Sequence, residues 1–398
     1  RREMRQRQLL NSVFSRHRRA FSTNTERCPR HQWRGNLKEY SVVYTDRAVN
    51  LMSSPFQGVM NDISSSLKSV YNTTGCILIP GSGTYGMEAV AKQLGQDQKC
   101  MVLRNGFFSY RWSEIFSMCQ IPSEEIVIKA QPVDKTSRPA FAPAPIDQVV
   151  DRIKAERPAV VFAPHVETST GIILPGSYIK AIADATHEVG GLFVLDCIAS
   201  GTVWVDMEAT GVDILITAPQ KGWSGPACVG IVMVNDKAKE RIAATESKTF
   251  VCNLKKWMEV MNKYEEGAFM YYTTLPTDSL SMFAHAIAET KEYGLDKAQA
   301  DMWTLGSRIR QVLESRGFPS TAAAGFQAPG VVVSYANDNN KVGEFKAQGL
   351  QIAAGVPWFI DEPGDIKTFR LGLFGLDKIA DIDATVSTFE SALDSILN

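Results

Sequence analysis

Short, almost wholly apolar runs separated by amphipathic segments are the feature of this 398-residue chain that most restricts its fold. Seven runs are typical of strands: residues 76–80, 101–104, 126–129, 159–164, 192–196, 214–217 and 229–234. Several are too continuously apolar to have a solvent-facing side, and segments such as "GMEAVAKQL" between them have a helical pattern. This alternation predicts an α/β fold with a mostly parallel, doubly wound sheet. In such sheets the ligand site lies at the carboxyl ends of the strands.

The pattern changes after about Thr274, where long helical segments are followed by two strand-like runs and a final amphipathic helix. We therefore expect a large domain at residues 51–274 and a smaller C-terminal α+β domain at 275–398, preceded by an N-terminal arm at 23–50. The Pro-rich stretch at 131–145 is interpreted as a surface excursion of the large domain.

The composition is that of a globular protein, with 44% hydrophobic residues, 21% charged residues and a net charge of -1. No basic excess favours nucleic-acid binding, and no apolar run approaches the roughly 18 residues of a membrane span. The seven cysteines lack metal-ligand spacing and favour neither a zinc site nor a disulfide framework.

The first 22 residues differ from the rest of the chain. From Met4 to Thr25 there are arginines and serines but no acid, which is the pattern of a mitochondrial presequence. Arg19, three positions before Ser22, predicts processing after Phe21. The alternative is a disordered basic arm, or read-through of a normally untranslated region, because three residues precede the first methionine. The protein would then be located in the cytoplasm.

A candidate phosphate site follows the first strand-like run. Gly81, Ser82, Gly83 and Thr84 end that run and open a helical segment. Free backbone N–H groups and two hydroxyls at a positive helix end are suited to a phosphate group. The stretch matches neither a dinucleotide fingerprint nor a Walker loop, and a tight capped turn remains the alternative.

Two ionisable residues also stand at strand ends. Asp196 ends "LFVLD", and a buried carboxylate needs a cation or hydrogen-bond donors. Lys221 follows "ILIT", where desolvation would lower its pKa and make a nucleophilic amine available. Alone, each is compatible with a structural aspartate or a lysine that reaches solvent. A phosphate site, an acid and a lysine at one sheet edge together fit pyridoxal phosphate, whose phosphate, ring nitrogen and aldehyde are held separately.

From about Glu39 to its end, the chain resembles the fold-type I pyridoxal-phosphate enzymes of aminotransferase class V, and among them the alanine/serine–glyoxylate (serine–pyruvate) aminotransferases. The shared motifs, in family order, are "GSGTYGMEA", "NGFFSYRW", "HVETSTGIILP", "LDCIASG", "APQKGWSGPACVG" and "FRLGLFG". The resemblance implies pyridoxal 5'-phosphate as cofactor and a homodimer with active sites at the subunit interface.

Carried over by position, the resemblance makes Lys221 the Schiff-base lysine and Asp196 the partner of the pyridinium nitrogen. Phe108 would stack on the cofactor ring, with Phe107 as the fallback, and Ile198 would pack on the opposite face. The other implied cofactor contacts are Ser82, Gly83, Thr84 and Gln220 at the phosphate, Thr168 near the ring hydroxyl, and Tyr271 and Thr274 reaching the phosphate of the neighbouring subunit. Glu167 and Ser169 are weaker candidates, and His165 is interpreted as structural.

Substrate contacts are also implied. The family uses the arginine at the position of Arg370 for the substrate carboxylate, which suits the planar fork of a guanidinium. Where family members commonly have Pro-Gly-Pro, this chain has "VVYTDRAVNLMS", so Tyr44 and Arg47 are candidate substrate contacts. A second cation would favour a dicarboxylic or phosphonate-bearing amino acid; a surface ion pair is the alternative for Arg47.

The resulting hypothesis is a ping-pong transaminase that moves an amino group from a small amino acid, alanine or serine, to glyoxylate or pyruvate. The alternatives are a class V lyase or desulfurase, a 2-aminophosphonate transaminase and a non-catalytic relative. Desulfurases have a histidine before the lysine, where this chain has Gln220, and Cys252 has no supporting motif. Trp223 is expected to pack under the turn that follows Lys221 rather than to line the substrate entrance.

Overall fold

A seven-stranded sheet forms the centre of the computed structural model, which describes residues 37–397. The presequence expected at 1–22 lies outside the described residues. The strand order is β1-β11-β10-β9-β6-β2-β3, and every strand is parallel to the others except β11, which is antiparallel to both neighbours. Their bounds are Gly75–Pro80 (β1), Lys99–Arg104 (β2), Glu124–Lys129 (β3), Val160–Pro164 (β6), Leu192–Asp196 (β9), Ile214–Thr217 (β10) and Val229–Val234 (β11). The predicted α/β fold with a mostly parallel sheet is confirmed.

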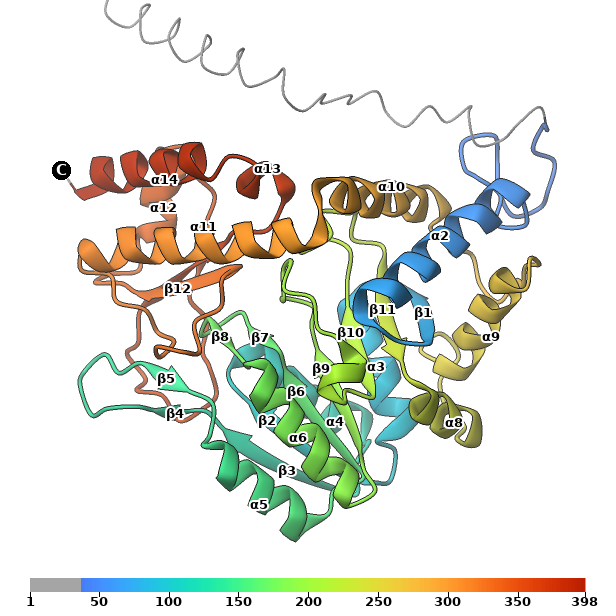
Figure 1. Cartoon of the computed structure of the whole chain (residues 1–398), viewed down its shortest axis with the longest axis horizontal. Coiled ribbons are helices and arrows are strands. Elements are labelled where there is room, and N and C mark those ends of the chain that lie inside the picture. Colours follow the sequence, from blue (N-terminus) through green and yellow to red (C-terminus); the bar gives the residue numbers. More distant parts are fainter. Residues whose placement is uncertain (1–36, 398) are drawn as a thin grey trace, which may run out of the picture.

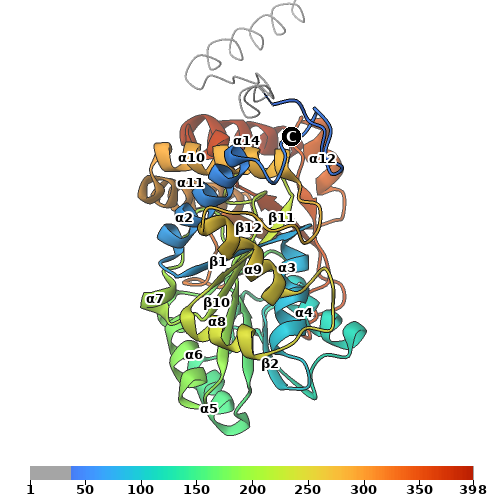
Figure 2. The same cartoon turned by 90° about the vertical axis from the view of Figure 1, so that its right-hand side faces the viewer.

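Helices cover both faces of this sheet (Figures 1 and 2). The helices α5 (Ile146–Glu156) and α6 (Gly176–Glu188) lie on one face, and α3 (Gly83–Leu94) and α4 (Phe107–Cys119) lie on the other. The strands β6, β9, β10 and β11 are buried along their whole length, as expected for strands covered on both sides. The remaining large-domain elements are α2 (Ser54–Tyr71), α7 (Met207–Thr210), α8 (Asp236–Ala244), α9 (Leu254–Glu265), and the short hairpins β4 (Gln131–Pro132) with β5 (Phe141–Ala142) and β7 (Val166–Glu167) with β8 (Ile172–Ile173).

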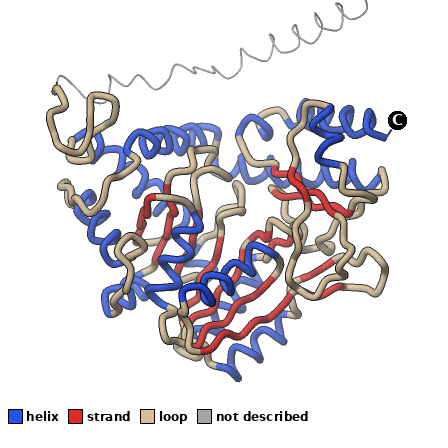
Figure 3. The backbone as a smooth tube through the Cα atoms, turned by 180° about the vertical axis from the view of Figure 1, so that it is seen from behind, coloured by secondary structure: helices blue, strands red, loops and turns tan. Residues whose placement is uncertain are grey.

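The C-terminal part has its own antiparallel sheet, ordered β12-β14-β13, which is separate from the large sheet in Figure 3. A second hydrophobic core begins at Ala298 and ends at Leu393. The elements are α11 (Leu295–Ser315), β12 (Val331–Tyr335), α12 (Lys341–Ala347), β13 (Ala353–Ala354), β14 (Thr368–Gly372), α13 (Leu376–Ile379) and α14 (Ile382–Leu397). This is the smaller α+β unit that the sequence pattern indicates.

Helix α10 (Thr277–Tyr293) packs with the large domain. Its buried residues Leu280, Phe283 and Ile287 belong to the core of the large sheet, and α10 lies beside α2 in Figures 1 and 2. Gly294, with φ 99°, separates α10 from α11. The domain division at residue 275 stays a prediction, and the distribution of the two cores favours a transition near Gly294.

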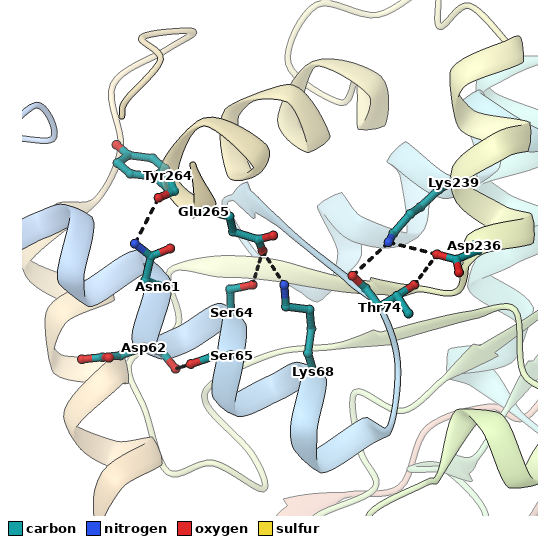
Figure 4. A network of polar contacts seen from close by, with 10 residues as sticks. All are labelled: Asn61, Asp62, Ser64, Ser65, Lys68, Thr74, Asp236, Lys239, Tyr264 and Glu265. Atoms are coloured by element: carbon teal, nitrogen blue, oxygen red, sulfur yellow. Dashed lines mark hydrogen bonds and ion pairs between the residues drawn. The ribbon is translucent and has the colours of Figure 1, made fainter. Parts of the chain in front are cut away.

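Polar contacts fix the helices beside the edge strand β1 (Figure 4). The Lys68 ammonium and the Ser64 hydroxyl on α2 both donate to the carboxylate of Glu265 on α9, the former at 2.8 Å. At the start of β1, Lys239 on α8 donates to the carbonyl oxygen of Thr74 at 2.9 Å. These bonds hold the strand that leads into the candidate phosphate turn.

No helix within residues 37–397 combines the length and the apolar character needed to cross a membrane.

Buried aromatic side chains support the turn after β10. Trp223 is 1% exposed, its indole N–H donates to the Tyr71 hydroxyl at 3.2 Å, and its ring packs against Trp204. Gly225 N–H donates to Pro219 O at 2.9 Å and closes the turn. Trp223 therefore packs under the turn, as the sequence analysis expects.

Close backbone contact makes Gly222 a site where a side chain cannot be accommodated. A Cβ atom there would lie 1.9 Å from the carbonyl oxygen of Gly201. We expect Gly222→Ala to lower the free energy of unfolding of the cofactor-free protein by about 2 to 3 kcal/mol, because backbone atoms must shift. The control is Gly58→Ala on the exposed face of α2, where no atom lies within 4 Å; it should be neutral or stabilise by up to about 1 kcal/mol. Urea midpoints that shift alike in the two variants would contradict this account.

Candidate active site

The carboxyl ends of β1, β2, β6, β9 and β10 bring most of the predicted cofactor-binding residues to one edge of the large sheet. Ile198 follows β9 and Gly83 follows β1, and a Cβ atom on Gly83 would lie 2.5 Å from the Ile198 side chain. Segments more than 100 residues apart in the sequence therefore meet there. The parallel strand order explains this, because parallel strands present their carboxyl ends on the same side.

The first turn of α3 has free hydrogen-bond donors. Ser82 is the N-cap residue, but its side chain makes no capping bond, and the first turn contains no acidic residue. Within residues 37–397 no acceptor pairs with the backbone N–H of Gly83 or Thr84. A positive helix end with unpaired donors suits an anion, so this observation supports a phosphate site.

The first turn of α4 is satisfied by a buried carboxylate. Glu167 is 0% exposed and accepts hydrogen bonds from the N–H groups of Phe108 at 3.1 Å and Ser109 at 2.9 Å. The Ser169 hydroxyl donates to the same carboxylate at 2.8 Å and accepts from Phe107 N–H at 2.9 Å. Glu167 and Ser169 thus fix the backbone that presents Phe108.

Asp196 is 7% exposed at the end of β9, and its carboxylate accepts from the N–H of Ile198 at 2.9 Å. In the described part of the chain no cation lies within ion-pair distance of it. Burial raises the pKa of Asp196 to about 7; the charge of Glu167 adds to this, and Arg111 and Lys221 oppose it. A protonated ring nitrogen is the donor that would complete this carboxylate.

Lys221 is half-buried, and its ammonium nitrogen lies 5.3 Å from the centre of the Phe374 ring. Burial lowers the pKa of Lys221, and the charges of Arg370 and Arg111 lower it further, while Asp196 acts in the opposite direction. A larger fraction of neutral amine is therefore available for nucleophilic attack.

The two phenylalanines of "NGFFSYRW" have different neighbours. The Phe107 ring lies 5.9 Å from that of Phe359 in the small domain. The half-buried Phe108 ring is flanked by the guanidinium groups of Arg111 at 5.1 Å and Arg370 at 5.7 Å. This arrangement favours Phe108 over Phe107 as the residue that would stack on the cofactor.

Arg370 on β14 reaches this edge from the small domain. Its Nε donates to Ala354 O at 2.7 Å, which orients the guanidinium. Burial lowers the pKa of Arg370, and the charge of Glu167 opposes this. No carboxylate within residues 37–397 forms an ion pair with it, so its terminal nitrogens can receive a substrate carboxylate.

Two further candidates lie beside these groups without partners of their own. Gln220 is exposed and Thr168 is half-buried. The structure gives neither side chain a hydrogen bond to another described residue, so both are available to a ligand.

Four candidates lie on the arm and on the segment before α10. The Tyr44 hydroxyl donates to Leu275 O at 3.1 Å, and Tyr271, 52% exposed, lies 3.4 Å from the Thr274 hydroxyl. Arg47 is exposed. Within residues 37–397 no hydrogen bond, ion pair or ring contact joins any of these four to Lys221, and their roles stay predictions.

Two other residues considered from the sequence, His165 and Cys252, are buried. His165 is 3% exposed, its Nδ1 lies 2.7 Å from the Ser200 hydroxyl, and burial lowers its pKa to about 4. Cys252 is 8% exposed, and burial raises its pKa to about 11, which is unsuited to a reactive thiolate. Among the described residues no group of His, Cys, Asp or Glu side chains is arranged to hold a metal ion.

Sequence reasoning missed Arg111. Its guanidinium donates to the Thr84 hydroxyl at 3.3 Å and lies over Phe108. The signal was present, because Arg111 is three residues after Phe108 on the same helix and side chains at that spacing share a face.

The raised pKa of Asp196 generates a prediction about the cofactor-free protein. Because the folded-state pKa of about 7 lies above the ordinary value of 3.8, the folded protein holds a proton there that the unfolded chain has lost between these pH values. The carboxyl group therefore destabilises the fold as the pH rises toward 7. Asp196→Asn removes this titration, so wild type should gain about 2 to 3 kcal/mol over the variant between about pH 8 and pH 5. Urea unfolding at both pH values measures it, and a constant difference would contradict the assignment.

Known proteins support the family that these residues indicate. The family described as Aminotransferase class-V matches residues 35–338. The 2-aminoethylphosphonate–pyruvate transaminase of Syntrophobacter fumaroxidans is 26% identical over 80% of this chain and 84% of its own length. Alanine–glyoxylate aminotransferase 1 of Saccharomyces cerevisiae is 24% identical over 81% and 84%.

Solved structures share the fold. The alanine–glyoxylate aminotransferase of Nostoc sp. superposes with a TM-score of 0.75 at 19% identity, over 88% of this chain and 89% of that one. The match extends across both domains, and the residues at the sheet edge fit the phosphate, ring nitrogen and aldehyde of pyridoxal 5'-phosphate. The chain belongs to the class V aminotransferase family and is a pyridoxal-phosphate-dependent transaminase of fold type I.

Proposed function

We propose that this transaminase moves an amino group from a small amino acid, alanine or serine, to glyoxylate or pyruvate in a ping-pong reaction. The observation that carries the proposal is that Lys221, Asp196 and Arg370 lie at the same sheet edge as the first turn of α3, which has no side-chain cap and no acidic residue. The names of relatives support the substrate class, since they include alanine–glyoxylate and L-aspartate–glyoxylate aminotransferases.

The chain's own residues would hold each part of the cofactor. Ser82, Gly83 and Thr84 would bind the phosphate with Gln220, Asp196 would hold the proton at the ring nitrogen, and Thr168 would contact the ring hydroxyl. Phe108 and Ile198 would hold the ring between two apolar surfaces. Bound in this way, pyridoxal phosphate supplies an electron sink for the charge left when the substrate loses its Cα proton.

Lys221 and Arg370 would divide the remaining work. Lys221, with its lowered pKa, would act as the amine that takes the proton from the substrate Cα and delivers it to carbon C4′ of the cofactor. In the second half-reaction it would move a proton from C4′ to the Cα of the new amino acid. Arg370 would pair with the substrate carboxylate through its terminal nitrogens, since Ala354 O already occupies Nε. The substrate Cα would then be held facing the Lys221 amine.

We also propose that the enzyme works as a homodimer. Tyr271 and Thr274 are exposed, and no hydrogen bond, ion pair or ring contact joins either of them to the Lys221 of the same chain, so both are accessible to a neighbouring subunit. Large apolar side chains are exposed nearby in the sequence, with Phe250 at 67% and Phe269 at 43%, as at many interfaces. Light scattering should give twice the chain mass, and a fully active monomer would reject the dimer.

A phosphonate-bearing donor is the second candidate substrate. One similar relative is named 2-aminoethylphosphonate–pyruvate transaminase, and Arg47 is an exposed cation on the arm. A lyase or desulfurase is less well supported, because Cys252 is buried with a raised pKa. A non-catalytic role is disfavoured by the retention of both Lys221 and Arg370.

For localisation we propose the mitochondrion, with the cytoplasm as the alternative. The support is the acid-free, arginine-rich sequence from Met4 to Thr25. A mature N-terminus at Ser22 in isolated mitochondria is expected, and an intact N-terminus in a cytosolic pool would reject the proposal.

A spectroscopic screen of amino donors tests the reaction. With alanine or serine, we expect the cofactor absorbance at about 410 to 430 nm to fall while a band at about 330 nm rises, because the amino group passes to the cofactor. Glyoxylate or pyruvate should reverse the change. If only 2-aminoethylphosphonate lowered the absorbance at about 410 to 430 nm, the phosphonate-bearing donor would be favoured. Release of ammonia or sulfide without the band at about 330 nm would reject transamination.

A further inference from the structure

We propose that Arg111 is the cation that pairs with the phosphate group of the cofactor. Arg111 lies in the first turns of α4, and its Nη1 donates to the Thr84 hydroxyl at 3.3 Å. Thr84 is in the first turn of α3, beside the unpaired N–H groups. The guanidinium therefore lies at the turn that is suited to the phosphate.

Arg111 has no anionic partner in the described chain. It is half-buried, and within residues 37–397 no carboxylate lies within 4.0 Å of its guanidinium. Lys221 and Arg370 at the same sheet edge also lack ion pairs there. Partly buried cations without partners are costly unless a ligand supplies the charge, so the site is built to receive anionic groups.

The positions of Lys221, Arg370 and Arg111 indicate which group each of these cations would bind. Lys221 follows β10, where the cofactor aldehyde is expected, and Arg370 reaches in from the small domain for the substrate carboxylate. Arg111 alone contacts the phosphate turn. A dianionic phosphate bound there would receive the guanidinium fork in addition to neutral donors, and charge-assisted bonds of this kind are about twice as strong as neutral ones.

The two helix ends at this edge explain why the phosphate binds at α3 rather than α4. The first turn of α4 is already filled by the buried carboxylate of Glu167. That of α3 has no acid and no side-chain cap. The anion-binding site of this edge is thus open only where Thr84 and Arg111 meet.

The test compares two probes that differ only in the phosphate. Cofactor-free wild type and Arg111→Met are titrated with pyridoxal 5'-phosphate and with pyridoxal, following tryptophan fluorescence. We expect the variant to bind pyridoxal phosphate about 10- to 100-fold more weakly and pyridoxal as well as wild type does. Inorganic phosphate should compete with pyridoxal phosphate more weakly in the variant.

Controls separate this role from others. Arg111→Lys keeps a charge and should recover part of the affinity, and Arg152→Met, at an exposed arginine on α5, should bind both probes as wild type does. Equal loss for both probes would show that Arg111 supports the ring or the fold and would overturn the proposal. Unchanged binding of both, with weaker binding of a dicarboxylate inhibitor to the loaded enzyme, would place Arg111 at the substrate and would also overturn it. The proposal rests on the cofactor and not on the donor; if wild type bound neither probe, the cofactor assignment itself would fail.

Discussion

Parallel pairing of β6, β9 and β10 is the constraint on which the rest of the site depends. The register pairs Pro164 with Asp196 and Ile216 with Asp196, so three strands end at one level. The loops after these strands carry Thr168, Ile198 and Lys221 to one edge of the sheet, although the three residues are far apart in the sequence. Glycine keeps this edge compact, because a Cβ atom on Gly83 or Gly222 would collide with the neighbouring segment. The fold thereby forms a binding site from residues that, taken singly, do not indicate one.

Charge then decides what that edge can bind. Within residues 37–397 no cation forms an ion pair with the buried Asp196, whose pKa is raised, while partial burial lowers the pKa of Lys221. Glu167 and Ser169 together accept the N–H groups of the first turn of α4, whereas no described side chain caps the first turn of α3 beside Arg111. A ligand with a phosphate, a protonated ring nitrogen and an aldehyde would complete these groups. Binding of the cofactor would therefore pair the charges of Asp196, Lys221 and Arg111.

The sequence predicted the sheet and its edge well because continuous apolar runs indicate strands covered on both faces, and strand ends indicate the site. All seven predicted strands occur in the large sheet. Side-chain partners were harder to foresee: Arg111 and the capping role of Glu167 depend on which helix ends meet, and this is a tertiary property. The sequence also did not indicate which domain α10 packs with, because the apolar face of this helix has the same pattern whichever hydrophobic core it joins. The roles of Tyr44, Arg47, Tyr271 and Thr274 stay predictions, because no hydrogen bond, ion pair or ring contact within residues 37–397 joins them to Lys221.

The central claim is that the cofactor is attached through Lys221. Reduction of the loaded protein with borohydride followed by peptide mass analysis measures it most directly, because reduction makes the bond between amine and cofactor permanent. We expect one modified peptide, containing Lys221, and no covalent cofactor in Lys221→Ala. That variant should still bind pyridoxal phosphate reversibly through Asp196 and the first turn of α3. A cofactor trapped on another lysine, in wild type or in the variant, would contradict it.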